Sequence, residues 1–280
     1  MKFGASTFIW VSPFSSESFY LLEKVRDMGF DVLEVCVEDP QTIDAQALKN
    51  AAAQAGIALL ICGAFGPSRD IGSEDVAVQE NGVAYIKTCI DIASVVGSPI
   101  VSGPMYAAVG VTRLLPANAR QAQWQRAADN MKIAADYAHE RGVKLAIEPL
   151  NRFETDFINT VDQGLAFLSM IDRDNVGFLL DTFHMNIEEK SIGDALRRAG
   201  DRIFNFHACA NDRGTPGEDH LPWDDIIAGL KDANYNGYVV IESFTTKITE
   251  IAKAVSLWRQ LAESEDALAQ NGLKFLKEIF

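Results

Sequence analysis

A run of apolar residues ends on a carboxylate at Val176-Gly177-Phe178-Leu179-Leu180-Asp181. Consecutive apolar residues are typical of a strand that is covered on both faces, as in a parallel sheet flanked by helices. Three more runs of this kind, at residues 143–148, 203–207 and 238–242, end on Glu148, His207 and Glu242. A charged side chain at such a position is costly unless a partner compensates it. The four residues therefore predict a site for a divalent cation, because one ion can compensate all of them.

Similar apolar runs alternate with stretches of helical periodicity along the whole chain. Strands are expected at residues 2–10, 31–38, 57–65, 99–106, 143–149, 176–182, 203–209 and 237–244. Helices are expected to fill the gaps between them, for example at residues 16–28, 45–55, 75–96, 119–141, 161–171, 223–233 and 248–262. Eight strand–helix units predict a parallel (β/α)8 TIM barrel, whose strands all have their carboxyl ends at one face. The four charged residues should converge at that face, where barrel enzymes carry their active sites.

The helix ends and the even composition indicate how the barrel is organised. Gly29, Gly56, Gly97 and Gly142 follow the first four helices, where a left-handed residue commonly ends a helix. No linker, low-complexity segment or change in composition divides the chain, so residues 1–280 are expected to form a single α/β barrel domain. Residues 267–280 are expected to form an extra C-terminal helix that packs on the barrel.

The composition narrows the classes of function. The chain of 280 residues is 48% hydrophobic and 23% charged, which is typical of a globular protein and not of a disordered one. Its formal net charge of −14 disfavours binding to nucleic acid or to anionic membranes, which carry charge of the same sign. The first residues lack a signal-peptide pattern, and no apolar run reaches the roughly 18 residues of a membrane span. We therefore expect a cytoplasmic protein with no nucleic-acid or membrane partner.

The ligand types indicate which metal is expected. Glu148, Asp181 and Glu242 supply carboxylate oxygens and His207 supplies an imidazole. The four cysteines form no CxxC pair and are expected to be buried, reduced thiols without a catalytic role. A mostly hard donor set favours Mn²⁺ or Mg²⁺, with Co²⁺ as an alternative and Zn²⁺ less suited. An ion held by four side chains keeps open positions, which two neighbouring sugar oxygens can fill.

Further polar residues follow three of the four runs. Glu154, His184 and Arg213 lie in the segments after Glu148, Asp181 and His207. Each also has a structural interpretation, which is the favoured one when the residue is taken alone. Glu154 can pair with the nearby arginine at position 152, His184 can be a satisfied core histidine, and Arg213 can hold the glycine-rich loop that follows it.

Taken together, these segments resemble the ketose 3-epimerases, the group that includes the D-tagatose, D-allulose (psicose) and L-ribulose 3-epimerases. The most specific of them is Asp181-Thr182-Phe183-His184-Met185-Asn186. The resemblance extends over essentially the whole chain. It is carried by residues 147–154, 180–189, 211–217 and 240–242, with weaker agreement over 66–70 and 73–75.

The resemblance implies a metal-dependent isomerase. Glu148, Asp181, His207 and Glu242 would bind a divalent metal, most often Mn²⁺ but also Co²⁺ or Mg²⁺, that holds O2 and O3 of a free ketose. Glu148 and Glu242 would also exchange the proton at C3 through a cis-enediolate and so invert that carbon. The family pattern further assigns His184 and Arg213 to substrate oxygens and Glu154 to the O1 end of the sugar.

Specificity and assembly follow less directly from the resemblance. Family members commonly place aromatic residues after strands one and four, against the far end of the sugar. Strand one offers Phe8 and Trp10, but residues 103–111 lack the tryptophan that D-allulose epimerases often carry. The preferred ketose therefore stays open. Family members are commonly dimers or tetramers, so a homodimer or homotetramer is expected.

Three alternative functions compete with this interpretation. An aldose–ketose isomerase on the same barrel could use the same ligands to move a proton between C1 and C2. A phosphodiesterase of the abasic-site endonuclease type needs more histidine ligands than the four histidines here can supply. A sugar-binding protein without activity would tolerate the loss of a catalytic group, but none is missing.

Overall fold

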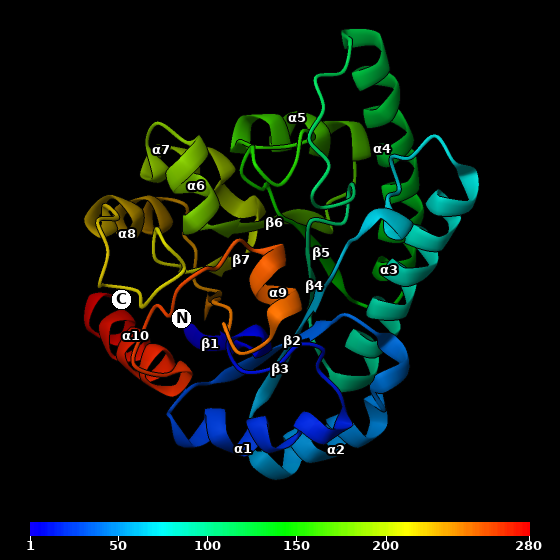
Figure 1. Cartoon of the computed structure of the whole chain (residues 1–280). Coiled ribbons are helices and arrows are strands. Elements are labelled where there is room, and N and C mark those ends of the chain that lie inside the picture. Colours follow the sequence, from blue (N-terminus) through cyan, green and yellow to red (C-terminus); the bar gives the residue numbers. More distant parts are fainter.

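Eight parallel strands form a closed barrel at the centre of the molecule, and the structure, a computed structural model, describes all 280 residues (Figure 1). Each strand pairs with its neighbour in sequence, and β1 pairs with β8 to close the ring. The strands are β1 (Lys2–Ser6), β2 (Val32–Val37), β3 (Ala58–Gly63), β4 (Ile100–Gly103), β5 (Lys144–Ile147), β6 (Val176–Asp181), β7 (Ile203–His207) and β8 (Tyr238–Ile241). The TIM-barrel prediction is therefore confirmed.

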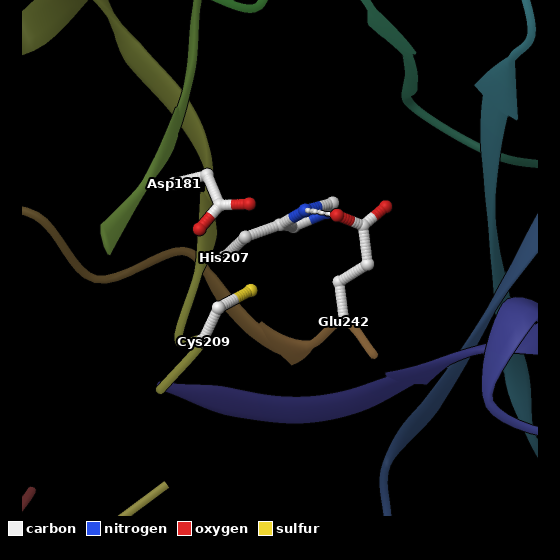
Figure 2. A group of neighbouring side chains, drawn as sticks. All are labelled: Asp181, His207, Cys209 and Glu242. Carbon is white, nitrogen blue, oxygen red and sulfur yellow. Dashed lines mark ion pairs between the residues drawn. The ribbon is translucent and has the colours of Figure 1, made fainter. Parts of the chain in front are cut away.

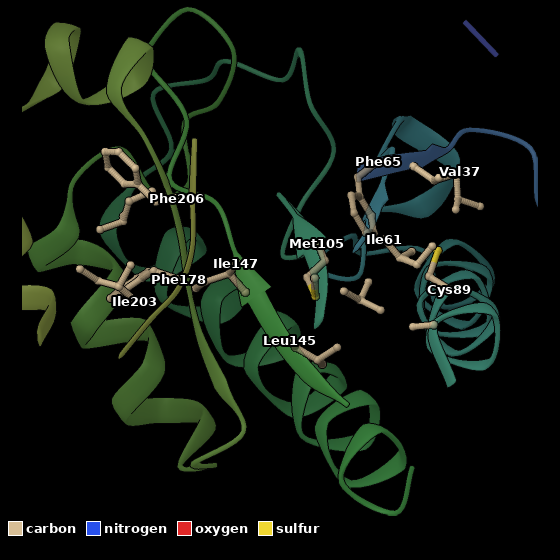
Figure 3. Close-up of a cluster of buried hydrophobic side chains, with 14 of the residues drawn as sticks. Val37, Ile61, Phe65, Cys89, Met105, Leu145, Ile147, Phe178, Ile203 and Phe206 are labelled. Atoms are coloured by element: carbon tan, nitrogen blue, oxygen red, sulfur yellow. The ribbon is translucent and has the colours of Figure 1, made fainter. Parts of the chain in front are cut away.

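Most of the helices form a ring around the barrel wall (Figure 1). The helices of the chain are α1 (Tyr20–Asp27), α2 (Ala45–Ala55), α3 (Val76–Val96), α4 (Ala117–His139), α5 (Val161–Ile171), α6 (Thr182–Glu188), α7 (Ile192–Ala199), α8 (Trp223–Asp232), α9 (Thr249–Ala254) and α10 (Glu265–Ile279). Apolar side chains of the strands pack against these helices in one core cluster of 65 buried residues. Figure 3 shows part of that core, in which Ile61 and Phe178 come from the barrel and Cys89 from α3.

Several predicted helix ends agree with the structure. Gly29, Gly56, Gly97 and Gly142 have φ angles of 93°, 72°, 80° and 66°, which confirms the left-handed residue expected after each of the first four helices. The C-terminal helix is also confirmed as α10. It begins after Ser264, whose side chain accepts a hydrogen bond from the backbone N–H of Ala267.

The prediction of a helix over residues 248–262 is correct only for its first turns. The helix α9 ends at Ala254, and Ser256 adopts a left-handed backbone with a φ of 55°, which interrupts the helical hydrogen bonds. In Figure 1, α9 lies over the mouth of the barrel, and α10 fills the place in the ring between α8 and α1. The chain between β8 and α10 therefore crosses the mouth before the last helix packs on the wall.

The strands are shorter than predicted because the chain bends as soon as it leaves the barrel. Residues Thr7–Ile9 form a 3-10 turn at the end of β1, and a second such turn, Ser16–Ser18, precedes α1. The apolar pattern continues through these segments because they are partly buried, although they no longer pair with other strands. No helix is both long enough and apolar enough to span a membrane.

Candidate metal centre

The four predicted ligands lie together at the carboxyl end of the barrel. Glu148 directly follows β5, Asp181 ends β6, His207 ends β7 and Glu242 directly follows β8. Parallel strands bring these positions to one face, as the sequence predicts. All four side chains are buried, with at most 6% of the residue exposed. Buried charges of this kind require compensation from one another or from a cation.

The side chains converge closely. Asp181, His207, Cys209 and Glu242 each place one potential ligand atom within 4.8 Å of the others (Figure 2). His207 Nδ1 lies 3.6 Å from Glu242 Oε2. Glu148, Asp181 and His184 form a second group whose potential ligand atoms also lie within 4.8 Å of one another. Asp181 belongs to both groups and links them.

Three buried atoms of the four ligands have no hydrogen-bond partner. They are Glu148 Oε1, His207 Nδ1 and His207 Nε2. Unsatisfied buried polar atoms are rare, and a bound ion is one of the few features that explains them. Three carboxylates and one imidazole also form a mostly hard donor set. The cluster therefore fits a divalent metal ion.

The electrostatics of the two glutamates differ. Burial and then the nearby charge of Glu242 raise the pKa of Glu148 well above its usual value. Burial alone would also raise the pKa of Glu242, but His207 and Arg213 outweigh it and lower that pKa to about 2. Burial alone would lower the pKa of His207, whereas the carboxylates of Glu34 and Glu242 raise it well above its usual value. Without a cation, positive charge in this cluster thus comes from His207 and Arg213.

Arg213 lies among the ligands. Its Nη1 is 2.5 Å from Asp181 Oδ2 and 3.0 Å from Glu242 Oε2, and its guanidinium lies over the ring of Phe183 at 4.0 Å from the centroid. The residue has a φ of 66°, a left-handed conformation that is uncommon for a bulky side chain. Such strain often occurs at functional sites, where the surrounding contacts maintain it.

His184 is a neutral buried imidazole at the same face. Burial and the charge of Arg213 lower its pKa to about 3. The backbone N–H of Asn151 donates to His184 Nδ1 at 3.1 Å, and Arg213 Nη2 lies 3.1 Å from His184 Nε2. That nitrogen lies 3.6 Å from Glu148 Oε1. His184 therefore presents Nε2 to the site, beside Glu148 and Arg213.

A cavity of about 460 Å³ opens directly onto these groups. Its inner lining contains Glu148, Glu154, His184, Arg213 and Glu242. The rest of the lining is mostly apolar and includes Phe8, Phe65, Val109, Leu150, Phe244, Ile251 and Val255. Every residue predicted to contact substrate, namely Glu154, His184, Arg213 and Phe8, thus lines one cavity. A larger hollow of about 730 Å³ lies at the opposite end of the barrel, away from the ligands.

The structure decides between the two interpretations of Glu154. Its side chain accepts a hydrogen bond from Asn151 Nδ2 at 2.8 Å and faces the cavity. Arg152 pairs instead with Glu188 at 2.9 Å. The pairing of Glu154 with Arg152 that the sequence allowed is therefore not formed, and Glu154 is available to a ligand.

Comparisons with known proteins agree with this geometry. Residues 22–279 match the family model described as xylose isomerase-like TIM barrel. Over the full chain and 97% of the relative, the sequence is 36% identical to a probable ketose 3-epimerase from Synechocystis sp.. The fold matches the structure of an L-ribulose 3-epimerase with a TM-score of 0.94 at 32% identity, covering 99% of this chain and 94% of the other. The chain belongs to the ketose 3-epimerase family. It is thus an isomerase of the epimerase class that acts on carbohydrates.

A further structural relative of this epimerase has a sugar bound. The D-allulose 3-epimerase from Methylomonas sp., solved in complex with D-allulose, matches with a TM-score of 0.92 at 28% identity. The match covers all of this chain and 97% of the relative.

Two residues near the ligands of this epimerase were not predicted. Cys209 places its sulfur beside Asp181, His207 and Glu242 (Figure 2). Burial and then the charge of Asp181 raise the pKa of this thiol well above its usual value, so it stays protonated and is a weak ligand. The sequence could have indicated Cys209 as a neighbour of the ligands, because it lies only two residues after His207. Glu34 of β2 contacts His207 from the other side. The sequence could have indicated Glu34, because it is a charged residue inside an apolar run.

Proposed function

We propose that this epimerase inverts free ketoses at C3 and that Glu148 and Glu242 carry the proton. The observation that supports this most directly is that both carboxylates line one cavity, with Asp181 and Arg213 beside them. The two glutamates follow β5 and β8, so they approach the cavity from different parts of the barrel. One can remove the C3 proton, and the other can return a proton to the opposite face.

The remaining polar residues assist the proton transfer. The proton at C3 is weakly acidic because it neighbours the C2 carbonyl, and its removal gives a cis-enediolate. Arg213 is positively charged and can stabilise the developing negative charge on oxygen. His184 Nε2 contacts a substrate oxygen, and Glu154 accepts from the hydroxyl at the O1 end. These groups are held in place by the barrel, so little reorganisation is needed during the reaction.

A divalent metal completes the proposed site. Glu148, Asp181, His207 and Glu242 would hold it, and it would polarise the substrate carbonyl as a Lewis acid. We propose Mn²⁺ as the native metal, with Co²⁺ or Mg²⁺ as alternatives, because the donor set is mostly oxygen.

The cavity lining supports a free sugar as the substrate. Arg213 is the only arginine or lysine among the lining residues, and it already contacts Asp181 and Glu242. A phosphorylated ketose would need further cationic or backbone donors at its phosphate end. The far end is lined by Phe8, Val109 and Ile251. We therefore propose unphosphorylated ketoses of the D-tagatose, D-allulose, D-fructose or L-ribulose type.

The reaction can be tested by isotope exchange. Purified protein loaded with Mn²⁺ is incubated in D₂O with D-fructose, D-tagatose, D-allulose and L-ribulose, and the products are followed by NMR. Deuterium at C3 together with an inverted product is expected. Aldose products labelled at C1 or C2 would instead support the aldose–ketose isomerase, and no exchange with any ketose would support a binding protein. The Glu148→Gln variant serves as the inactive control.

Assembly and location are also proposals. We propose a homodimer or homotetramer of one-domain barrels spanning residues 1–280, located in the cytoplasm. Three large apolar side chains support association because they are strongly exposed in the single chain: Leu114 at 101%, Phe153 at 74% and Trp258 at 74%. Light scattering coupled to size-exclusion chromatography measures the mass, and a monomer at micromolar concentration would contradict the proposal.

A further inference from the structure

Glu34 is a carboxylate enclosed in the barrel, away from the cavity. It is the third residue of β2 and is fully buried. An apolar cluster of Val32, Leu60 and Val240 lies on the amino-terminal side of it. No lysine or arginine pairs with it, and its one ion-pair contact is with His207. A carboxylate in such surroundings is costly, so its contacts must explain why it is there.

The contacts of Glu34 lead directly to the proposed metal ligand. Its Oε1 lies 2.8 Å from His207 Nε2, and neither atom has another hydrogen-bond partner. The contact is therefore a close ion-pair contact that does not meet the geometry of a regular hydrogen bond. Its Oε2 accepts from Asn205 Nδ2 at 2.8 Å, and the same Nδ2 lies 3.2 Å from Ser102 Oγ. The carboxylate is thereby fixed against the imidazole.

The two ring nitrogens of His207 face different groups. Nε2 faces Glu34, whereas Nδ1 faces Glu242 within the ligand cluster. Figure 2 shows the ring between Asp181 and Glu242. A neutral imidazole carries one ring proton, and the partner of one nitrogen decides which nitrogen keeps it. When a bound cation displaces the proton on Nδ1, the carboxylate beside Nε2 keeps the remaining proton there and leaves the Nδ1 lone pair directed into the cluster.

We propose that Glu34 is a positioning residue that holds His207 as the Nε2–H tautomer and so prepares Nδ1 to bind the divalent metal. The inference rests on the proposed function, because it takes His207 as a ligand. A carboxylate behind a metal-bound histidine fixes the ring and makes the ligand atom more basic. Loss of such a partner typically lowers metal affinity about 10- to 100-fold.

The competing interpretation is that Glu34 only links strands inside the barrel. Asn205 and Ser102 belong to β7 and β4, so the same network also connects separate strands. A purely structural role predicts lower stability of the metal-free protein without a specific change in metal binding. Ser102→Ala is the matched control, because it removes a contact to Asn205 and leaves the contact between Glu34 and His207.

The test measures Mn²⁺ affinity by electron paramagnetic resonance of free Mn²⁺ on chelator-treated protein. Glu34→Gln is expected to bind Mn²⁺ about 10- to 100-fold more weakly than the wild type, with a similar unfolding midpoint of the metal-free form. Ser102→Ala is expected to bind like the wild type. Wild-type affinity in Glu34→Gln would overturn the role of Glu34 alone. Failure of the wild type to bind Mn²⁺ would overturn the proposed metal site as well.

A second measurement needs no variant and decides the question if Glu34→Gln does not fold. The ¹⁵N chemical shifts of the histidine rings are recorded by NMR on wild-type protein loaded with diamagnetic Mg²⁺. His207 is expected to show a proton on Nε2 and a metal-bound, unprotonated Nδ1. A proton on Nδ1 would overturn the proposal.

Discussion

The two ends of the barrel interior contrast in chemistry although the same strands build both. The carboxyl end gathers Glu148, Asp181, His207, Arg213 and Glu242, all buried. The amino-terminal side is closed by a small cluster of aliphatic residues from β2, β3 and β8. Burying charge lowers stability, whereas burying aliphatic side chains raises it. The contrast suggests that one end carries the chemistry and the other maintains the barrel that positions it.

The largest expected effect is at the carboxyl end. Glu148→Gln and Glu242→Gln should each lower kcat for C3 epimerisation by at least about 1,000-fold, because each removes a proton carrier. Both variants should still fold, since glutamine has nearly the same shape. NMR of the products measures the loss of kcat, and circular dichroism checks that the variants fold. Glu140→Gln, at an exposed site just after α4, is the control, and substantial turnover by either site variant would contradict the two-glutamate mechanism.

The opposite end should respond in stability and not in chemistry. Leu60→Ala removes a fully buried side chain from the aliphatic cluster. We expect it to lower the free energy of unfolding by about 3 kcal/mol, because the lost contacts and the new cavity both contribute. Urea unfolding measures this. The kcat below the unfolding transition should stay close to that of the wild type, and a large loss of kcat with unchanged stability would break the contrast between the two ends.

A bound divalent metal should stabilise the fold, because it compensates the buried charges at the carboxyl end of the barrel. Chelator-treated protein is expected to be inactive, and Mn²⁺ should restore its activity. Mn²⁺ at about 100 times its Kd should also stabilise the fold by roughly 2.7 kcal/mol, because it binds only the folded state. Thermal unfolding at several Mn²⁺ concentrations measures the shift. Activity that is indifferent to chelator would remove the metal from the mechanism.

Low pH should lower the free energy of unfolding through the protonation of His184 in the unfolded state. Its pKa in the folded protein is lowered to about 3, so between pH 6.5 and pH 5 only the unfolded state takes up the proton. Stability should therefore fall as the pH falls, by on the order of 2 kcal/mol over this range from His184 alone. Urea unfolding of the metal-free wild type and His184→Asn at both pH values isolates the effect. His139→Asn, on the exposed side of α4, should keep the wild-type slope.

The sequence predicted the parts of this protein that depend on local patterns. A strand buried on both faces gives an unbroken apolar run, and a charge at its end stands out against that background. The runs before Asp181 and Glu242 are examples, and the structure places both residues at the carboxyl end of the barrel. The helix expected through residue 262 ends at Ala254 because Ser256 adopts a left-handed backbone, and the apolar side chain of Val255 lines the cavity.

What the sequence determined by itself is the barrel, its direction and the end at which the charged residues meet. These follow from the order of strands and helices, since parallel strands necessarily share one carboxyl end. Only the tertiary structure decided which groups touch: Arg213 against Asp181 and Glu242, and Glu34 behind His207. The physical reason is that closure of the barrel brings β2 and β7 to a common interior, and periodicity along a single strand contains no information about what lies on the other side.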